Sequence, residues 1–309
     1  MTALGDRTAN DTAAAPVVSC LGVPVTAHTR EGAARRVVHR ALQVRRAREA
    51  HRAGEGGGTA VAPAGSDVHL CNAYTLALGD RDPALLRTLR SAFLNLADGQ
   101  PVVWANQLLH RGTALPRRRV YGPDLMLDVF SMSQGTGLRH YLLGSTPEVL
   151  AALQRELRRR FPRAVLAGTC SPPFRSLTSQ ELREQEDDIR AVGADIVWVG
   201  LGTPLQDHRA AELSAALPVV SVAVGAAFDF IAGSKRQAPP WMQYGGLEWL
   251  FRLGCEPRRL WRRYLFGNAR FVGGVVRQAA LRTPPGASAP PARPPDAGTA
   301  LVSRRERAR

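Results

Sequence analysis

The feature that most constrains the fold is a regular alternation of short β-prone segments and longer helix-prone segments between Asp67 and Val224. The expected strands are Val68–Cys71, Phe93–Ala97, Arg139–Leu143, Ala164–Ala167, Ile196–Val199 and Val219–Val224. The expected helices are Pro83–Ser91, Pro101–His110, Asp124–Ser133, Pro147–Arg160, Ser179–Val192 and Pro204–Leu217. This alternation predicts an α/β fold with a largely parallel, Rossmann-like sheet flanked by helices, whose ligands bind beyond the carboxyl ends of the strands.

Composition divides the rest of the chain. Residues 1–16 are small and polar, which predicts a disordered N-terminus. The α/β core is expected over 17–245, with a short β segment at Cys20–Val25, a helix from about Arg30 and a flexible, glycine-rich excursion over 51–66. A basic helical appendage follows over 246–282, and a Pro-, Ala- and Arg-rich tail over 283–309 is predicted to be disordered.

Positive charge is concentrated at the C-terminal end. From position 251 onward there are 13 arginines and three acidic residues, which gives +10 of the net +15, while Lys235 is the only lysine of the 309 residues. A basic segment of this kind binds phosphate, in nucleic acid or in anionic lipid, and charge alone does not distinguish the two.

Cellular placement is predicted from three further features. The N-terminus lacks a charged start followed by an apolar run, and the sequence has no apolar run of the length, about 18 residues, that spans a bilayer. The four cysteines are far apart, without metal or disulfide spacing: Cys20, Cys71, Cys170 and Cys255. These features favour a cytoplasmic protein.

Asp98 is the first candidate site residue. In Leu96-Ala97-Asp98-Gly99-Gln100-Pro101 a strand ends and a helix begins, so Asp98 lies at the carboxyl end of a strand. There it could act as a general base on a substrate hydroxyl, or it could only cap the following helix.

Two glycine turns also follow predicted strands. Gly200-Leu201-Gly202-Thr203-Pro204-Leu205-Gln206 lacks the third glycine of a dinucleotide fingerprint, but its glycines allow backbone N–H groups to approach a phosphate. Gly225-Ala226-Ala227-Phe228-Asp229 follows the next strand, and Asp229 either faces a ligand or is a hydrogen-bonded turn carboxylate.

No metal site is expected. Asp80-Arg81-Asp82 matches the D-x-D pattern of many sugar transferases, but Pro83 follows at once, which favours Asp82 as a helix N-cap. No other cluster has the spacing of metal ligands.

The appendage combines aromatic and basic residues. After Pro257, a predicted helix carries Leu260, Trp261, Tyr264 and Leu265 on one side and Arg258, Arg259, Arg262 and Arg263 on the other. This pattern is typical of an interfacial helix, although an ordinary surface helix packed on the domain has a similar composition.

Taken in order, these segments resemble one family. The segments are LGVPV, CNAYTLALGD, ADGQPVVWA, RRVYGPDLM, YLLGSTPEV, DIVWVGLGTPLQD, AVGAAFDFIAGSKRQAPPWM and GLEWLFRLGCEPRRLWRRY, and they extend from about Val18 to Phe271. On them the chain resembles the WecG/TagA/CpsF glycosyltransferases, also called glycosyltransferase family 26. The resemblance implies an inverting, metal-independent transferase without a cofactor. It also implies a UDP-sugar donor, a polyprenyl-diphosphate-linked acceptor and a position at the inner face of the plasma membrane.

The resemblance also assigns residues. Asp98 matches the proposed catalytic base, Gln206 a family glutamine, and Arg252, Arg259 and Arg262 the appendage arginines thought to meet diphosphate or lipid phosphate. With the positions singled out above, the predicted substrate-binding set is Asn72, Asp124, Gly200, Gly202, Gln206, Gly225, Asp229, Arg252, Arg259 and Arg262.

The sequence departs from the family pattern at three places. Asn72 is kept, but the family threonine beside it is replaced in Leu70-Cys71-Asn72, and Leu205 and Asp207 replace the usual lysine and glutamate. A catalytically silent membrane scaffold of the same family therefore stays an alternative. A basic nucleic-acid-binding α/β protein would explain the charge but not ADGQPVVWA.

Overall fold

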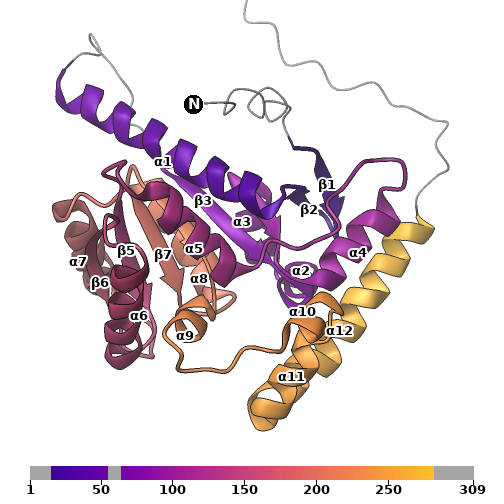
Figure 1. Cartoon of the computed structure of the whole chain (residues 1–309). Coiled ribbons are helices and arrows are strands. Elements are labelled where there is room, and N and C mark those ends of the chain that lie inside the picture. Colours follow the sequence, from indigo (N-terminus) through magenta and orange to yellow (C-terminus); the bar gives the residue numbers. More distant parts are fainter. Residues whose placement is uncertain (1–14, 55–63, 282–309) are drawn as a thin grey trace, which may run out of the picture.

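The computed structural model describes residues 15–54 and 64–281, and its core is a six-stranded sheet (Figure 1). The strand order is β4-β3-β8-β7-β5-β6, and every neighbouring pair is parallel. The strands are β3 (Ser66–Cys71), β4 (Leu94–Ala97), β5 (Arg139–Gly144), β6 (Val165–Cys170), β7 (Ile196–Gly200) and β8 (Val220–Ala223). The predicted α/β fold with a parallel sheet is confirmed.

Helices cover both faces of the sheet. On one face, α1 (Arg30–Arg52), α5 (Gly122–Ser133), α6 (Pro147–Arg160) and the short α9 (Ala227–Ile231) bury apolar side chains in the main core. On the other face, α7 (Ser179–Ala191) and α8 (Leu205–Ala216) pack against the central strands. The strands are apolar nearly throughout because a parallel sheet is buried on both sides.

A separate hydrophobic cluster lies beside the β4 edge. A hairpin of β1 (Val17–Cys20) and β2 (Val23–Thr26) forms it with α2 (Ala73–Gly79), α3 (Pro83–Ser91) and α4 (Gln100–Leu109). The sequence predicted one β segment here. The chain instead turns at Leu21 and Gly22, whose φ angles are 51° and 77°.

The predicted flexible loop over 51–66 has different boundaries in the structure. Helix α1 continues to Arg52 and β3 begins at Ser66, so the connection is shorter than 51–66, and its residues 55–63 lie outside the described part. The predicted disordered ends, 1–16 and 283–309, lie outside it too, except for residues 15 and 16. Helices α2 and α9 were not predicted, because segments of five to seven residues are too short to show a helical period.

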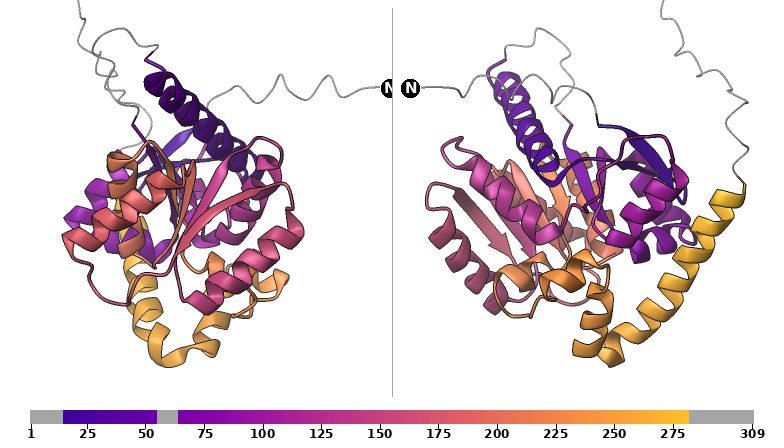
Figure 2. Two further views of the ribbon diagram at one scale, coloured as in Figure 1. Left: turned by 90° about the vertical axis from the view of Figure 1, so that its left-hand side faces the viewer. Right: turned by 45° about the vertical axis from the view of Figure 1, so that its right-hand side comes forward.

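The predicted appendage, 246–282, contains α11 (Glu248–Cys255) and α12 (Pro257–Ala280), in orange and yellow in Figures 1 and 2, and the short α10 (Pro240–Tyr244) precedes it. Helix α11 and the start of α12 project from the core, and the rest of α12 runs back along α2 and α4. Gln278 Oε1 accepts a hydrogen bond of 2.8 Å from Leu21 N, and its Nε2 donates one of 2.9 Å to Ser19 O. Within the described ranges, no helix combines the length and apolar character needed to cross a membrane.

Candidate active site

Asp98 lies immediately after β4, but it does not cap the helix that follows it. Gly99 is the N-cap of α4 and provides no side-chain hydrogen bond. Asp98 Oδ1 instead accepts a hydrogen bond of 3.0 Å from the backbone N–H of Gly122, the first residue of α5. The carboxylate is therefore positioned by two neighbouring elements at the carboxyl edge of the sheet.

A small cavity of about 80 Å³ surrounds Asp98 between the core and the appendage. The core contributes Asn72, Tyr74, Gln100 and Arg119, and the appendage contributes Glu248, Trp249, Arg252, Tyr264 and Asn268. Two of the predicted binding residues, Asn72 and Arg252, thus share this cavity with Asp98. The cavity is smaller than a sugar nucleotide, so a complete donor reaches Asp98 only if the appendage moves or the ligand extends past its rim.

The electrostatic surroundings of Asp98 favour a proton acceptor near neutral pH. Burial raises the pKa of Asp98 to about 6. The positive charges of Arg119 and Arg252 and the Gly122 N–H oppose this rise, while the negative charge of Glu248 adds to it. A carboxylate with a pKa of this kind is suited to general-base catalysis at physiological pH.

An ion pair joins the two halves of the cavity. Arg119 Nη2 lies 2.5 Å from Glu248 Oε2, and the Tyr121 hydroxyl lies 3.4 Å from Glu248 Oε1. Arg119 Nη1 also donates to the backbone oxygen of Asp98 at 3.3 Å. Sequence reasoning missed Arg119 and Glu248. Their signal was present in RRVYGPDLM and GLEWL, but the two segments are far apart in the chain.

Asn72, which lines the cavity, also caps a helix. Its Oδ1 accepts hydrogen bonds from Tyr74 N at 3.0 Å and Thr75 N at 3.1 Å, which caps α2. Because the carbonyl oxygen is engaged in the cap, the Nδ2 group is the part of Asn72 that could donate to a ligand.

The predicted glycine turns lie together at the ends of β7 and β8. Gln206 is buried, and its Oε1 accepts a hydrogen bond of 3.0 Å from Gly202 N. A Cβ atom on Gly225 would lie 3.7 Å from the Gln206 amide, so this side chain contacts both turns. Gly202 and Gly225 have φ angles of 82° and 59°, which glycine adopts readily. At Gly200, a Cβ atom would lie 2.9 Å from the Phe228 ring, so close packing requires this glycine.

The N-terminus of α5 connects these turns with the Asp98 cavity. A Cβ atom on Gly122 would lie 3.0 Å from the Leu70 side chain and 3.2 Å from Val224 O, which shows how closely α5 approaches β3 and β8. In the strand order, β4 is two strands from β8 and three from β7. At about 4.8 Å per strand, Asp98 is about 10–14 Å from the glycine turns. That separation fits the span of a sugar diphosphate.

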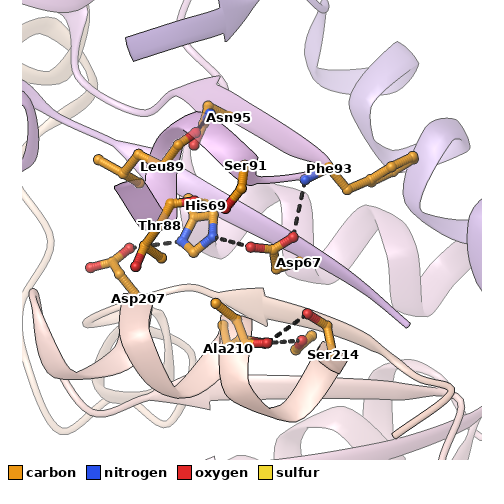
Figure 3. A network of polar contacts seen from close by, with 12 residues as sticks. Asp67, His69, Thr88, Leu89, Ser91, Phe93, Asn95, Asp207, Ala210 and Ser214 are labelled. Atoms are coloured by element: carbon orange, nitrogen blue, oxygen red, sulfur yellow. Dashed lines mark hydrogen bonds and ion pairs between the residues drawn. The ribbon is translucent and has the colours of Figure 1, made fainter. Parts of the chain in front are cut away.

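A buried charge network fixes α8, which carries Gln206, against β3. Figure 3 shows the ring of His69 between Asp67 and Asp207. His69 Nδ1 is 3.0 Å from Asp207 Oδ1, and His69 Nε2 is 2.9 Å from Asp67 Oδ2. Burial opposes a charged imidazole, but the two carboxylates outweigh it and raise the pKa of His69 to about 9. The replacement of the family glutamate by Asp207 therefore keeps an acidic partner for a buried cation.

Four predicted binding residues lie elsewhere. Asp124 forms an ion pair of 3.1 Å with Arg30. Asp229 lies 3.3 Å from Lys235 Nζ and accepts from the Ser234 hydroxyl, as expected for a turn carboxylate. Arg262 lines a groove next to the Asp98 cavity. The side chain of Arg259 lies outside what the structure describes.

The D-x-D segment is occupied by structural contacts. Asp82 is the N-cap of α3, as predicted, and its Oδ1 accepts from Ala84 N and Leu85 N. Asp80 pairs with Arg277 of α12 at 2.9 Å. Over residues 15–54 and 64–281, no cluster of three acidic, histidine or cysteine side chains has the arrangement of a metal site.

The appendage helix differs from its predicted pattern. Leu260 is buried and Tyr264 lines the Asp98 cavity, whereas Trp261 and Leu265 are 44% and 61% exposed. Of the four residues predicted on one apolar side of the helix, Leu260 and Tyr264 therefore face the core, and Trp261 and Leu265 face the solvent.

The parallel α/β sheet, with a partly buried carboxylate and arginines at the carboxyl ends of its strands, is an arrangement suited to sugar transfer. Residues 18–284 match the glycosyl transferase WecG/TagA/CpsF family, and the chain belongs to it. It is also 31% identical over 198 residues to the N-acetylglucosaminyldiphosphoundecaprenol N-acetyl-beta-D-mannosaminyltransferase of Bacillus spizizenii. That alignment covers 64% of this chain and 73% of the relative. The expected family and the glycosyltransferase activity are thus confirmed.

Proposed function

We propose that this glycosyltransferase moves a sugar of the N-acetylhexosamine or uronic acid type from a UDP-sugar to a polyprenyl-diphosphate-linked saccharide. It would act, with inversion and without a metal, in the assembly of a cell-surface polysaccharide or a teichoic-acid-like glycan. The observation that supports this most is Asp98, a partly buried carboxylate with a pKa of about 6, in a cavity that Arg119 and Arg252 also line. The Bacillus spizizenii relative, by its name, transfers N-acetylmannosamine to a diphosphoundecaprenol-linked sugar.

In the proposed reaction, Asp98 accepts the proton of the acceptor hydroxyl as that oxygen attacks the anomeric carbon of the donor. The new C–O bond forms on the face opposite the diphosphate, the bond between the anomeric carbon and the diphosphate oxygen breaks, and UDP leaves with the electron pair. Arg252 in the cavity and the backbone N–H groups of the Gly202 and Gly225 turns stabilise the charge on the departing diphosphate.

The appendage supports a peripheral position at the inner face of the plasma membrane. Leu250, Trp261 and Leu265 are exposed by 47%, 44% and 61%, and arginines 258 and 262 are exposed beside them. Exposed aromatic and aliphatic side chains bind the apolar interior of the interface, and each nearby arginine adds about 1 kcal/mol on an anionic membrane. A lipid-linked acceptor would then reach the Asp98 cavity from the membrane side.

The test is a transfer assay with a panel of UDP-sugars, including UDP-N-acetylmannosamine. The acceptor is N-acetylglucosaminyl-diphosphoryl-undecaprenol in phosphatidylglycerol-containing vesicles, and products are read by mass spectrometry with and without EDTA. We expect a product larger by one sugar, with the anomeric configuration inverted, in both conditions. Absence of product with every donor would refute the proposed substrates, and strict dependence on Mg²⁺ or Mn²⁺ would refute the metal-free mechanism.

A further inference from the structure

A second cavity, of about 310 Å³, lies between α12 and the end of α2, next to the Asp98 cavity. Of the residues that the structure describes, three arginines line this groove, Arg81 from the loop after α2 and Arg262 and Arg270 from α12. Tyr74 lines both cavities, so the groove adjoins the Asp98 cavity at this residue. Helix α12 packs closely on it, because a Cβ atom on Gly267 would lie 3.1 Å from the Tyr74 ring.

Among the described residues, no ion pair neutralises the arginines of this groove. No carboxylate pairs with Arg81, Arg262 or Arg270 in the part of the chain that the structure describes. Asp82 also lines the groove, and its carboxylate accepts from two backbone N–H groups at the start of α3. Asp80 nearby is paired with Arg277. Three guanidinium groups around one cavity repel one another, and a bound anion would remove that repulsion.

Two of the guanidinium groups are held in place by aromatic rings. Arg262 lies over the Trp261 ring at 5.1 Å, and Arg270 lies over the Phe266 ring at 5.9 Å. A cation–π contact uses the face of a guanidinium and leaves its N–H donors available to a second acceptor. Arginine N–H groups match the oxygens of phosphate in bidentate contacts, so the chemistry of the groove fits a diphosphate.

We infer that the arginine groove of Arg81, Arg262 and Arg270 binds the diphosphate of the lipid-linked acceptor. The inference rests on the proposed function, in which the reaction involves two diphosphates. In that proposal the donor diphosphate is bound by Arg252, which lines the Asp98 cavity, and by the glycine turns. The acceptor diphosphate must lie one sugar residue from the attacking hydroxyl at Asp98, and the groove is one side chain away.

The position of the groove also fits a lipid ligand. Arg262 and Arg270 belong to the same helix as the exposed Trp261 and Leu265. An acceptor bound there would place its prenyl chain beside these apolar side chains, at the end of the molecule that is proposed to contact the membrane. A UDP diphosphate has no apolar chain that would benefit from this surface.

Binding to the full chain tests the assignment without requiring turnover. Isothermal titration with farnesyl diphosphate and with UDP is carried out on wild-type protein, Arg81→Gln, Arg270→Gln and the double variant. Arg87→Gln, an exposed arginine of α3 that does not line the groove, is the matched control. We expect each groove variant to weaken farnesyl diphosphate binding at least fivefold and UDP binding less than twofold, while the control changes neither.

Three results would overturn the inference. Unchanged affinity for farnesyl diphosphate would show that the groove is not a diphosphate site, and an equal loss for UDP would assign it to the donor. If the groove variants no longer sediment with phosphatidylglycerol vesicles but keep their affinity for farnesyl diphosphate, the arginines bind lipid headgroups instead.

Kinetics separate failure of this inference from failure of the proposed function. If the wild-type protein transfers sugar, we expect the groove variants to raise the KM of the acceptor at least fivefold and to leave the KM of the donor unchanged. Normal transfer with an unchanged acceptor KM would refute the groove alone. Absence of transfer by wild-type protein, with the binding pattern above intact, would refute the proposed reaction and retain the diphosphate site.

Discussion

Arg119 Nη2 lies 2.5 Å from Glu248 Oε2, and this ion pair connects the α/β core with the appendage at the cavity of Asp98. Both groups are largely buried, and both act on the carboxylate: the charge of Arg119 lowers the pKa of Asp98, and the charge of Glu248 raises it. The appendage therefore contributes to the electrostatics of the proposed base as well as to the shape of its cavity.

The first prediction concerns the proposed base. We expect Asp98→Asn to reduce turnover at least about a hundredfold, because an amide cannot accept the proton of the acceptor hydroxyl, and to change UDP affinity less than twofold. Steady-state kinetics and UDP titration measure the two effects. Asp124→Asn and Asp229→Asn are the controls, since both carboxylates are paired with cations elsewhere. If Asp98→Asn keeps near-normal turnover and one of the two control variants loses turnover, the carboxylate replaced in that control is the base.

The second prediction concerns the pH dependence of the reaction. The carboxylate of Asp98 is the active form and its pKa is about 6, so kcat/KM should fall as the pH decreases through about 6. Glu248→Gln removes a negative charge that raises this pKa, and we expect it to move the acidic limb to lower pH. Profiles of kcat/KM between pH 4.5 and 8 measure the shift. If the acidic limb of the Glu248→Gln profile stays at the same pH as in the wild type, or moves to higher pH, a group other than Asp98 controls it.

The third prediction concerns stability. The pKa of Asp98 is raised in the folded protein from 3.8 to about 6, so the folded state holds the proton more tightly than the unfolded chain. This contribution to stability is therefore lost as the pH rises from about 4 to about 6. Asp98→Asn removes this partly buried charge and should stabilise the fold by on the order of 1 kcal/mol at pH 7.5, but not at pH 4. Denaturant unfolding at the two pH values measures the difference, and destabilisation at pH 7.5 would contradict the prediction.

The fourth prediction concerns the Asp67–His69–Asp207 network. The pKa of His69 is raised to about 9, so its stabilisation is complete below pH 6.5 and is lost as the pH rises through about 9. His69→Ala leaves two buried carboxylates without their cation and should cost about 3–5 kcal/mol at pH 6.5. His140→Asn is the control, because burial lowers the pKa of His140 to about 3 and this residue stays neutral over the same range. Equal pH slopes for wild type and His69→Ala would indicate a neutral His69.

The fifth prediction concerns membrane contact. Trp261→Ser combined with Leu265→Ser should reduce co-sedimentation with anionic vesicles at least about fivefold, because two exposed apolar anchors are lost. Point variants are used because deletion of the appendage would also remove Phe271 and Val275 of α12, which are buried in the cluster beside β4, and would expose that cluster. Phe174→Ser, which changes an exposed aromatic residue outside the appendage, is the control. Equal vesicle binding of the double variant and wild type would refute this contact.

Much of the architecture was predictable because it depends on local signals. Helices α3 and α6 have the predicted bounds, since Pro83 and Pro147 each follow a capping side chain, Asp82 and Thr146, at the first turn. The six strands were recognisable as short apolar runs between helices, as a parallel sheet buried on both faces requires. Segments without such signals were not recognised: α2 was not predicted, and β1 and β2 were predicted as a single β segment because the turn between them was not seen.

For the site, the sequence alone determined which residues lie at the carboxyl ends of strands, because a strand followed by a turn and a helix is a local pattern. Asp98 and the glycine turns were found in this way, whereas Asn72 was found only through the resemblance to the family. Only the tertiary structure decided which of them share a cavity, because this depends on the strand order and on contacts between distant segments. The tertiary structure pairs Arg119 with Glu248, which is 129 positions further along the chain, and places Arg81 and Arg270, 189 positions apart, in one groove. It also pairs Asp124 with Arg30 and Asp229 with Lys235. Charge pairing between distant residues leaves no periodic signal in a single sequence, so packing alone decides which charged side chains remain available to a ligand.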